Sequence, residues 1–257
     1  MNPAEPRTRP FVDGSVSLLA LAAFSALIVF GFAGEMGPWA GALTAALVVL
    51  GFLPWLGAGT RVVLLFAAGA GATVVLLPPV WPVLQLALLV VPLAGLLAIP
   101  SMKLSSPWFE RGRFDALPVV ALAVMAGVAL VVWKAWAQPD LSDAESMLPK
   151  WPVPLLVLGA LGFSIVNALL EEVAFRGVLQ AALRERFGDG VWPLLLQGAA
   201  FGVFHWYGVP RGAMGALMAG SWGVMLGWAR RRSGGLLTPL IAHVVADIVI
   251  FSLLAMG

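Results

Sequence analysis

The stretch VPLLVLGALGFSIVNALLEEVAFR, residues 153 to 176, joins an uncharged apolar run to two adjacent glutamates and an arginine. The run is as long as a membrane-spanning helix, which needs about 20 apolar residues to cross the hydrocarbon core of a bilayer. Its apolar residues are continuous, whereas a strand of a transmembrane barrel alternates apolar and polar residues. The stretch therefore predicts a transmembrane helix that meets Glu171, Glu172 and Arg176 at its end.

The composition of the whole chain indicates the same environment. Of its 257 residues, 61% are hydrophobic and 11% are charged, whereas a soluble domain carries about 25% charged residues. Backbone polar groups find no water inside a bilayer, so spanning elements must satisfy their hydrogen bonds internally. The predicted fold is an all-α, polytopic transmembrane bundle of about eight or nine helices, with membrane lipid as a partner.

Hydropathy predicts the individual spans. The third and fourth are separated only by prolines, so either could be a broken or re-entrant segment. In the span from 212 to 229, small residues recur every four positions, a pattern that lets helices approach closely in lipid. The predicted spans are 15–33, 38–57, 62–79, 82–100, 117–137, 153–172, 191–209, 212–229 and 236–256.

Basic residues concentrate on alternate connectors between these spans. The positive-inside rule then predicts a cytoplasmic amino terminus, with residues 1–14 as a cytoplasmic tail. Because topology accounts for the basic residues, no nucleic-acid partner is expected; the sequence does not specify the oligomeric state. The residues on the predicted inside connectors are Arg7, Arg9, Arg61, Lys103, Arg111, Arg113, Arg184, Arg186, Arg230, Arg231 and Arg232.

Polar residues within the helices divide the chain into two parts. The front helices, residues 15–137, carry few polar side chains and no motif that we identify, whereas the helices of residues 150–257 carry several. Function is therefore expected in the back part. The chain has no cysteine, which excludes disulfides, thiolate metal ligands and a cysteine nucleophile.

The charged group after residue 170 has two interpretations. It could mark the cytoplasmic end of the span, where charges are well hydrated. Alternatively it lies within the membrane, where an ionised carboxylate costs about 2.5 to 3.5 kcal/mol. Glu172 and Arg176 are four residues apart and can neutralise each other. Glu171 then remains beside Asn167, with no charged partner on its own helix.

The two histidines of the chain favour the second interpretation. His205 and His243 both lie in apolar spans, and Asp247 follows His243 by one helical turn. Ionisable residues inside a membrane are candidates for a functional site. Mutual satisfaction of these groups requires their three helices to converge, so the sequence predicts a shared polar cavity.

Carboxylates and histidines in one cavity suit hydrolysis. A glutamate can take a proton from water while histidines polarise a carbonyl group. Alternatively, Glu171, His205 and His243 could bind a divalent metal such as zinc that activates the same water. A proton-linked transporter could use the same residue types. Residue types alone leave these alternatives open.

Three segments together resemble a known family. EEVAFR at 171–176, FGVFH at 201–205 and HVVAD at 243–247 are similar to the motifs of the CPBP intramembrane proteases, named for CAAX processing and bacteriocin processing. The family is also called Abi or type II CAAX prenyl endopeptidase. The resemblance covers roughly residues 150–250. It implies an intramembrane endopeptidase acting on a membrane-associated protein or peptide, here expected in a bacterial inner membrane.

The resemblance also implies residue roles. Glu171 would activate water, assisted by His205, while Glu172 and Arg176 support the site. His243 and residue 247 would stabilise the oxyanion. Asp247 departs from the family's commoner asparagine, so either it is protonated or it orients His243. Both a metalloprotease and a metal-free mechanism are argued for the family, and this sequence lacks the HExxH zinc signature.

One geometric requirement accompanies this prediction. Counted from the expected cytoplasmic ends at about 1.5 Å per residue, Glu171 lies near the membrane surface and His205 roughly 20 Å deep. Contact between them requires a register shift of about two helical turns, which we predict. The alternatives are a rhomboid-like serine protease using Ser221 with His243 as base, or a non-catalytic immunity, scaffold or transport protein.

Overall fold

The fold is an all-α helical bundle. The computed structural model describes residues 10–77, 80–104, 108–146 and 148–255, and these contain no β-strand. Arg7, Arg9, Pro78 and Pro79, on which part of the topology prediction rests, lie outside the described residues. The elements are α1 Pro10–Ala26, η1 Leu27–Gly31, α2 Pro38–Gly51, α3 Ala58–Val75, α4 Val83–Ala98, η2 Pro100–Met102, α5 Ala116–Ala137, α6 Ser142–Ser146, α7 Val153–Glu171, η3 Glu172–Leu179, α8 Gln180–Phe187, α9 Trp192–Phe204, α10 Gly212–Ser233 and α11 Leu237–Ala255.

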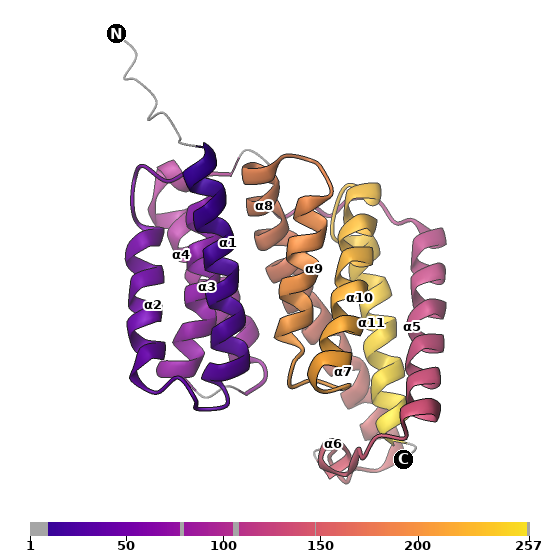
Figure 1. Cartoon of the computed structure of the whole chain (residues 1–257). Helices are drawn as coiled ribbons and strands as arrows, with labels where there is room; N and C mark the ends of the chain where they lie inside the picture. Colours follow the sequence, from indigo (N-terminus) through magenta and orange to yellow (C-terminus); the bar gives the residue numbers. More distant parts are fainter. Residues whose placement is uncertain (1–9, 78–79, 105–107, 147, 256–257) are drawn as a thin grey trace.

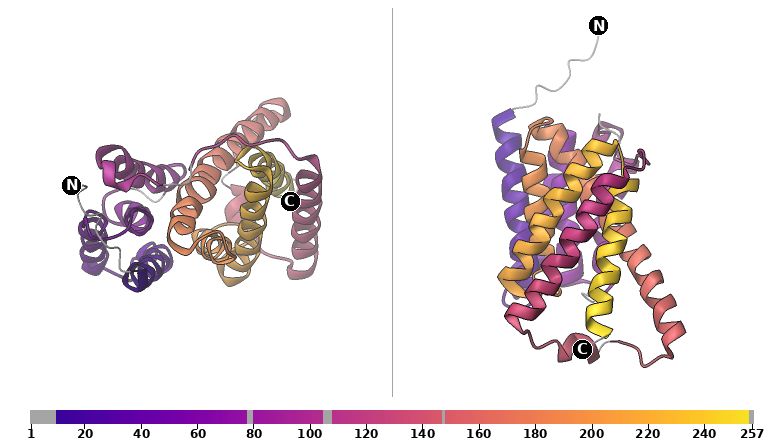
Figure 2. Two further views of the ribbon diagram at one scale, coloured as in Figure 1. Left: turned by 90° about the horizontal axis from the view of Figure 1, so that it is seen from above. Right: turned by 90° about the vertical axis from the view of Figure 1, so that its right-hand side faces the viewer.

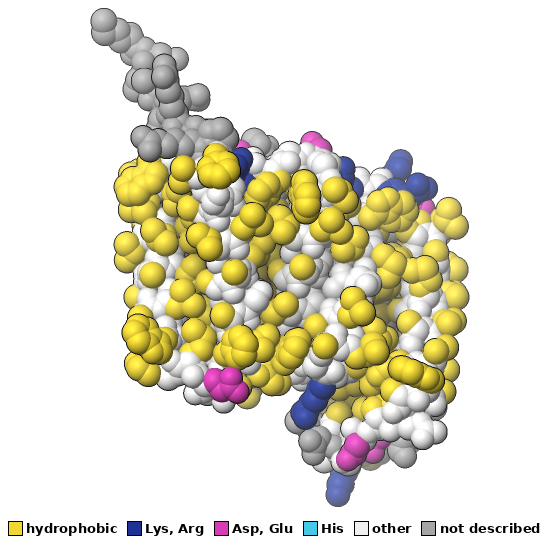
Figure 3. All heavy atoms as spheres, in the orientation of Figure 1, with side chains coloured by type: hydrophobic (Ala, Val, Ile, Leu, Met, Phe, Trp, Pro, Cys, Tyr) yellow, Lys and Arg dark blue, Asp and Glu magenta, His cyan; other side chains and the backbone are white. Residues whose placement is uncertain are grey.

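The long helices stand side by side and alternate in direction along the chain (Figure 1). Five described segments are long and apolar enough to cross a membrane, and hydrophobic side chains cover much of the outer surface (Figure 3). The prediction of a transmembrane bundle is confirmed, and the chain is an integral membrane protein. The five segments are Phe11–Gly31, Ala58–Val75, Ala116–Ala137, Val153–Phe187 and Leu237–Ala255.

The predicted end of the sixth span at residue 172 was wrong. The helix continues from α7 through η3 and α8 as one apolar segment, Val153–Phe187, of 35 residues. The prediction from hydropathy ended the span at the charged residues. In the structure, Glu172 and Arg176 are fully buried and form an ion pair inside the protein. Because the two charges satisfy each other there, the helix does not have to end where they begin.

The segment η3 is a π-helix, Glu172–Leu179. Its hydrogen bonds run from residue i to i+5, so each turn is wider than in an α-helix, and such segments are frequent at functional sites. Both Glu171, the last residue of α7, and Glu172, the first of η3, are buried, and Glu172 pairs with Arg176 four residues later.

The helices form two groups, seen from above in Figure 2. The front bundle consists of α1 to α4. Its helix α3 is mostly buried among the others. The back bundle consists of α7 to α11, and α5 packs against α11 at its edge. The helix α5 belongs to the predicted front part in sequence but lies far from α1 to α4 in space.

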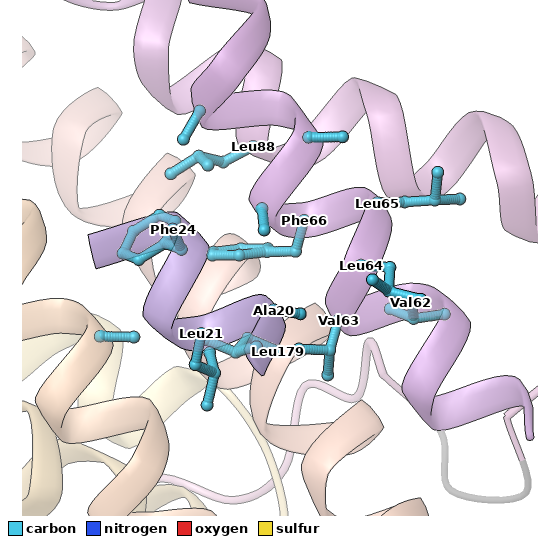
Figure 4. Packing of buried hydrophobic residues seen from close by; sticks show 14 of the residues in the cluster. Ala20, Leu21, Phe24, Val62, Val63, Leu64, Leu65, Phe66, Leu88 and Leu179 are labelled. Atoms are coloured by element: carbon cyan, nitrogen blue, oxygen red, sulfur yellow. The ribbon is translucent and has the colours of Figure 1, made fainter. Parts of the chain in front are cut away.

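Aromatic side chains join the two bundles. The rings of Phe24 on α1 and Phe66 on α3 are 5.6 Å apart, and Phe66 packs edge-on against Phe175 of η3 at 5.4 Å. Buried side chains such as Leu179 and Ala20 complete this core (Figure 4). The π-helical segment that carries Glu172 and Arg176 thus packs against the front bundle as well as the back bundle.

Glycines allow α9 and α10 to pack closely, as the repeat of small residues predicted. A Cβ atom added at Gly202 would lie 2.3 Å from the carbonyl oxygen of Ala216, and one at Gly198 would lie 2.9 Å from that of Gly220. In addition, the amide nitrogen of Gln197 donates to the Gly223 carbonyl over 2.7 Å. This contact fixes the position of α9, which ends one residue before His205.

Basic connectors meet at one end of the bundle. The connector after α8 is joined to the end of α10, because Arg231 donates to the Gly190 carbonyl over 2.9 Å. Arg232 in turn pairs with Asp115 before α5 at 2.9 Å. The hydrogen bond from Arg184 lowers the pKa of the exposed Asp189 carboxyl. Three connectors that the charge pattern placed on one side therefore lie together.

Candidate active site

The predicted site residues converge in the middle of the back bundle. Asn167 and Glu171 come from α7, Glu172 and Arg176 from η3, His205 from the end of α9, and His243 and Asp247 from α11. Except for His205, which is partly buried, all of them are buried. The structure thus joins the three motif segments in one polar cluster within an otherwise apolar bundle.

The depth of Glu171 differs from the sequence prediction, and this difference brings it to His205. Glu171 lies 16 residues before the end of α8 at Phe187, so it is near the middle of the continuous helical segment Val153–Phe187 and not at its end. His205 follows the 13-residue helix α9, which begins at the same end of the bundle. At about 1.5 Å per residue, both lie at similar depth. The predicted contact therefore arises from the extension of α7.

Glu172 holds two cationic or hydrogen-bonding partners. Its Oε1 atom lies 2.7 Å from Nδ1 of His243 and 3.0 Å from Nη1 of Arg176. The guanidinium group of Arg176 also stacks on the ring of Phe201, 4.1 Å from its centre. A buried charge that lost its partner would cost several kcal/mol. Glu172 and Arg176 therefore form a rigid unit that orients the imidazole ring of His243.

Glu171 directs one carboxylate oxygen toward both histidines. Its Oε2 atom lies 3.7 Å from Nε2 of His205 and 3.6 Å from Nε2 of His243. These separations exceed direct hydrogen-bonding distance, and Oε2 has no hydrogen-bond partner among the described residues. Both Nε2 atoms therefore lie close to the one carboxylate oxygen of Glu171 that has no hydrogen-bond partner among the described residues.

The tautomer of His205 follows from its backbone contact. Its Nδ1 atom lies 2.9 Å from the carbonyl oxygen of Phe201. A carbonyl oxygen can only accept, so Nδ1 carries the proton. In the neutral ring, Nε2 is then unprotonated and faces Glu171. The side chain is 25% exposed, whereas that of Glu171 is 3% exposed, so His205 is the more accessible of the two.

Asp247 is tied to both His243 and Asn167. Its Oδ1 atom lies 3.6 Å from Nε2 of His243, and its Oδ2 atom accepts a hydrogen bond of 3.1 Å from Nδ2 of Asn167. The sequence analysis placed Asn167 only beside Glu171. In the structure, Asn167 instead supplies the donor that contacts the aspartate.

Two side chains of the front bundle also reach the site, and the sequence analysis missed them. Trp81, before α4, donates from its indole nitrogen to Oδ1 of Asn167 over 3.0 Å. Gln85 of α4 approaches Oε1 of Glu171 at 3.5 Å. The expectation that function lies in the back part was therefore incomplete. The sequence contains one indication of this contact, because Gln85 interrupts the apolar run VLQLALLVV with a polar amide.

A cavity of about 420 Å³ adjoins the cluster between α5, α9, α10 and α11. His205, His243 and Asp247 form its polar wall, and apolar side chains such as Met218 and Trp222 line most of the remainder. Glu171 is close to both histidines but does not itself line the cavity.

Ser221, the alternative nucleophile, also lines this cavity. The ring nitrogens of His243, however, face carboxylates: Nδ1 faces Glu172 at 2.7 Å, and Nε2 faces Glu171 at 3.6 Å. A serine protease needs its histidine within hydrogen-bond reach of the serine hydroxyl. The contacts of His243 therefore favour glutamate chemistry over serine chemistry.

The metal hypothesis named Glu171, His205 and His243 as ligands. Zinc needs three or four ligands at about 2.0 to 2.2 Å for nitrogen and oxygen donors. The described residues contain no group of three or more His, Cys, Asp or Glu side chains arranged to hold a metal ion. No step below is therefore derived through a metal.

The fold and the cluster define a polytopic membrane protein with a buried site of glutamates and histidines. Residues 152–249 match the family described as "Type II CAAX prenyl endopeptidase Rce1-like". These residues therefore form a domain of that family, and the resemblance seen in the three motif segments is confirmed. The family is one of peptidases. No curated protein and no solved structure matches the chain.

Proposed function

We propose that the protein is an intramembrane endopeptidase in which Glu171 activates the attacking water. The observation that carries the proposal is the position of the Glu171 Oε2 atom, 3.7 Å from Nε2 of His205 and 3.6 Å from Nε2 of His243. A water molecule beside these groups, within hydrogen-bond reach of Oε2, can give a proton to the carboxylate and attack a carbonyl carbon held in the cavity. The attacking water oxygen and the carbonyl carbon then both lie beside Glu171, His205 and His243.

The proton and electron pairs balance without another reactant. Glu171 takes one proton from water, and the hydroxide forms a bond to the carbonyl carbon of the peptide. The tetrahedral oxyanion is stabilised by a hydrogen bond from Nε2 of His243 in its doubly protonated form, a contact of the kind that usually contributes most to acyl transfer, while the unprotonated Nε2 of His205 accepts from the water. Glu171 then returns the proton to the leaving nitrogen as the C–N bond breaks. The products are a carboxylic acid and an amine, which exchange one proton to give a carboxylate and an ammonium group.

The other residues orient these groups. Glu172, held by Arg176, accepts from His243 and fixes its ring. Asp247 faces the same ring from the other side, which supports the interpretation that Asp247 orients His243 in place of donating to the oxyanion itself. His205 keeps Nε2 directed toward Glu171 because its other nitrogen is bound to the Phe201 carbonyl. A divalent metal is not part of this mechanism.

The apolar lining of the cavity supports a membrane-associated protein or peptide as substrate. The scissile peptide bond would lie against the polar wall, and apolar groups beside it would contact α5 and α10. The family description names CAAX prenyl substrates, so a prenylated CAAX peptide and its unprenylated form are the first pair to compare. We further propose a cytoplasmic amino terminus in a bacterial inner membrane, which a cytoplasm-specific reporter fused to that end would test.

The decisive experiment measures cleavage of membrane-anchored peptides by the purified protein in detergent. Replacing Glu171 with glutamine keeps the shape of the side chain but removes the base, so we expect kcat to fall by about 10²-fold to 10⁴-fold. Ser221→Ala is the matched cavity variant, and it should keep nearly full activity. Thermal unfolding of each variant checks that it folds. Loss of activity in Ser221→Ala together with an active Glu171→Gln enzyme would overturn the proposal.

A further inference from the structure

The part of the polar cluster contributed by α4 lies outside the matched family region of residues 152–249. Trp81 donates to Oδ1 of Asn167 over 3.0 Å, and Nε2 of Gln85 lies 3.4 Å from the same oxygen and 3.5 Å from Oε1 of Glu171. Gln85 is 7% exposed. The front bundle thus contacts two residues of the proposed active site directly.

The hydrogen bond from Trp81 determines the orientation of the Asn167 side-chain amide. An indole nitrogen can donate but cannot accept, so the Asn167 atom that faces it must be the oxygen. The amide nitrogen of Asn167 then faces Oδ2 of Asp247 at 3.1 Å. The opposite orientation would place two donors together and turn an oxygen toward the carboxylate. A donor on the front bundle therefore determines the contact that holds Asp247 beside His243.

Gln85 contacts one oxygen of the Glu171 carboxylate, and the histidines lie near the other. Its amide nitrogen lies on the Oε1 side of the carboxylate, which leaves Oε2 near His205 and His243. The Oε1 atom of Gln85 itself has no hydrogen-bond partner among the described residues. A buried polar atom without a partner costs about 1 to 3 kcal/mol. An apolar residue would stabilise α4 better, so stability does not account for a glutamine at this position.

We propose that Trp81 and Gln85 are positioning residues of the active site. Trp81 orients Asn167 and, through it, Asp247; Gln85 holds Glu171 with Oε2 toward the histidines. Neither residue lines the cavity, so both act through other side chains and not on the substrate. This inference rests on the proposed endopeptidase function.

The first test replaces Gln85 with methionine, which has a similar length and no hydrogen-bonding amide. We expect kcat to fall about 10-fold to 100-fold, as for other partners of catalytic groups, with KM within about 2-fold because the cavity is unchanged. Gln180→Met is the matched control. Gln180 is also buried, but it donates to the backbone of α10. Its loss should lower Tm and leave kcat unchanged.

The second test replaces Trp81 with phenylalanine. This variant removes only the indole donor, because an aromatic ring can still pack on Phe163, whose ring centre lies 5.0 Å from that of Trp81. We expect a reduced kcat in the wild-type background and no further reduction in an Asn167→Ala background, since the two residues act in one chain of contacts. Trp133→Phe in α5 is the control; Trp133 is buried, whereas Trp81 is 45% exposed, and the variant should keep wild-type kcat.

The outcomes separate this inference from the function on which it rests. An inactive wild-type protein, or an active Glu171→Gln variant, would contradict the proposed function. An active wild type with an inactive Glu171→Gln variant, together with wild-type kcat in Gln85→Met and Trp81→Phe, would overturn the positioning role alone. A fall in kcat that is additive with Asn167→Ala would overturn the role of Trp81.

Discussion

The two bundles each bury an arginine, and the two arginines differ in the groups that they contact. Arg61 of α3 is 2% exposed and Arg176 of η3 is 0% exposed. Arg61 donates to neutral oxygens, the Gly51 carbonyl and the Ser101 hydroxyl, both at 3.0 Å. Arg176 instead pairs with Glu172, which also contacts His243. Both arginines are almost fully buried, so the difference between them lies in the groups that they contact.

This difference has a general consequence for reading charges in membrane proteins. An arginine that joins a loop carbonyl and a hydroxyl fixes the ends of neighbouring helices, here α2, α3 and η2. An arginine in an ion pair with a carboxylate that also holds a histidine orients a titratable group. Intramembrane charge alone therefore marks a candidate, and the chemistry of its partners decides between the two roles.

The largest expected effect comes from Arg176→Met. Removing one member of a buried ion pair costs about 3 to 5 kcal/mol, and the carboxylate of Glu172, which orients the His243 ring, is then no longer held by Arg176. We expect a large fall in Tm and loss of cleavage per folded molecule. Chemical denaturation and the peptide assay measure the two effects. A stable Arg176→Met protein with full activity would remove the distinction between the two arginines.

The same substitution in the front bundle, Arg61→Met, should act on stability alone. It leaves the Gly51 carbonyl and the Ser101 hydroxyl without this donor, which costs about 1 to 3 kcal/mol for a buried group. We expect a lower free energy of unfolding, with kcat and KM per folded molecule unchanged. If kcat fell as far as in Arg176→Met, Arg61 would belong to the site and the comparison would fail.

The smallest effect is expected for an exposed ion pair. Arg184 and Asp189 approach to 2.6 Å, but the side chain of Asp189 is 72% exposed, and such pairs contribute little. Because the pKa of Asp189 is lowered in the folded protein, its contribution is present above the ordinary Asp pKa of about 3.9 and is lost as the pH falls below it. Asp189→Asn should unfold within experimental error of wild type at pH 7, as measured by thermal melting. A large loss of stability would show that this connector matters more than its exposure indicates.

The family region and the polar residues of the back bundle could be predicted from the sequence because their signals are local. Apolar runs of fixed length predict helices, and charges or histidines inside such runs are costly enough to be rare. The spacing of Glu172 and Arg176, and of His243 and Asp247, follows from the helical repeat. Gln85 gave a similar local signal, but its meaning depended on a partner 86 residues away.

By itself, the sequence determined the membrane environment, the all-α class and the residues of the three motif segments. Only the tertiary structure decided that α7 continues to Phe187, that α5 packs on α11, and that Trp81 and Gln85 reach Asn167 and Glu171. The physical reason is the same in each case. Whether a charged or polar group can be buried depends on the partner that packing brings to it, and those partners come from helices distant in the chain.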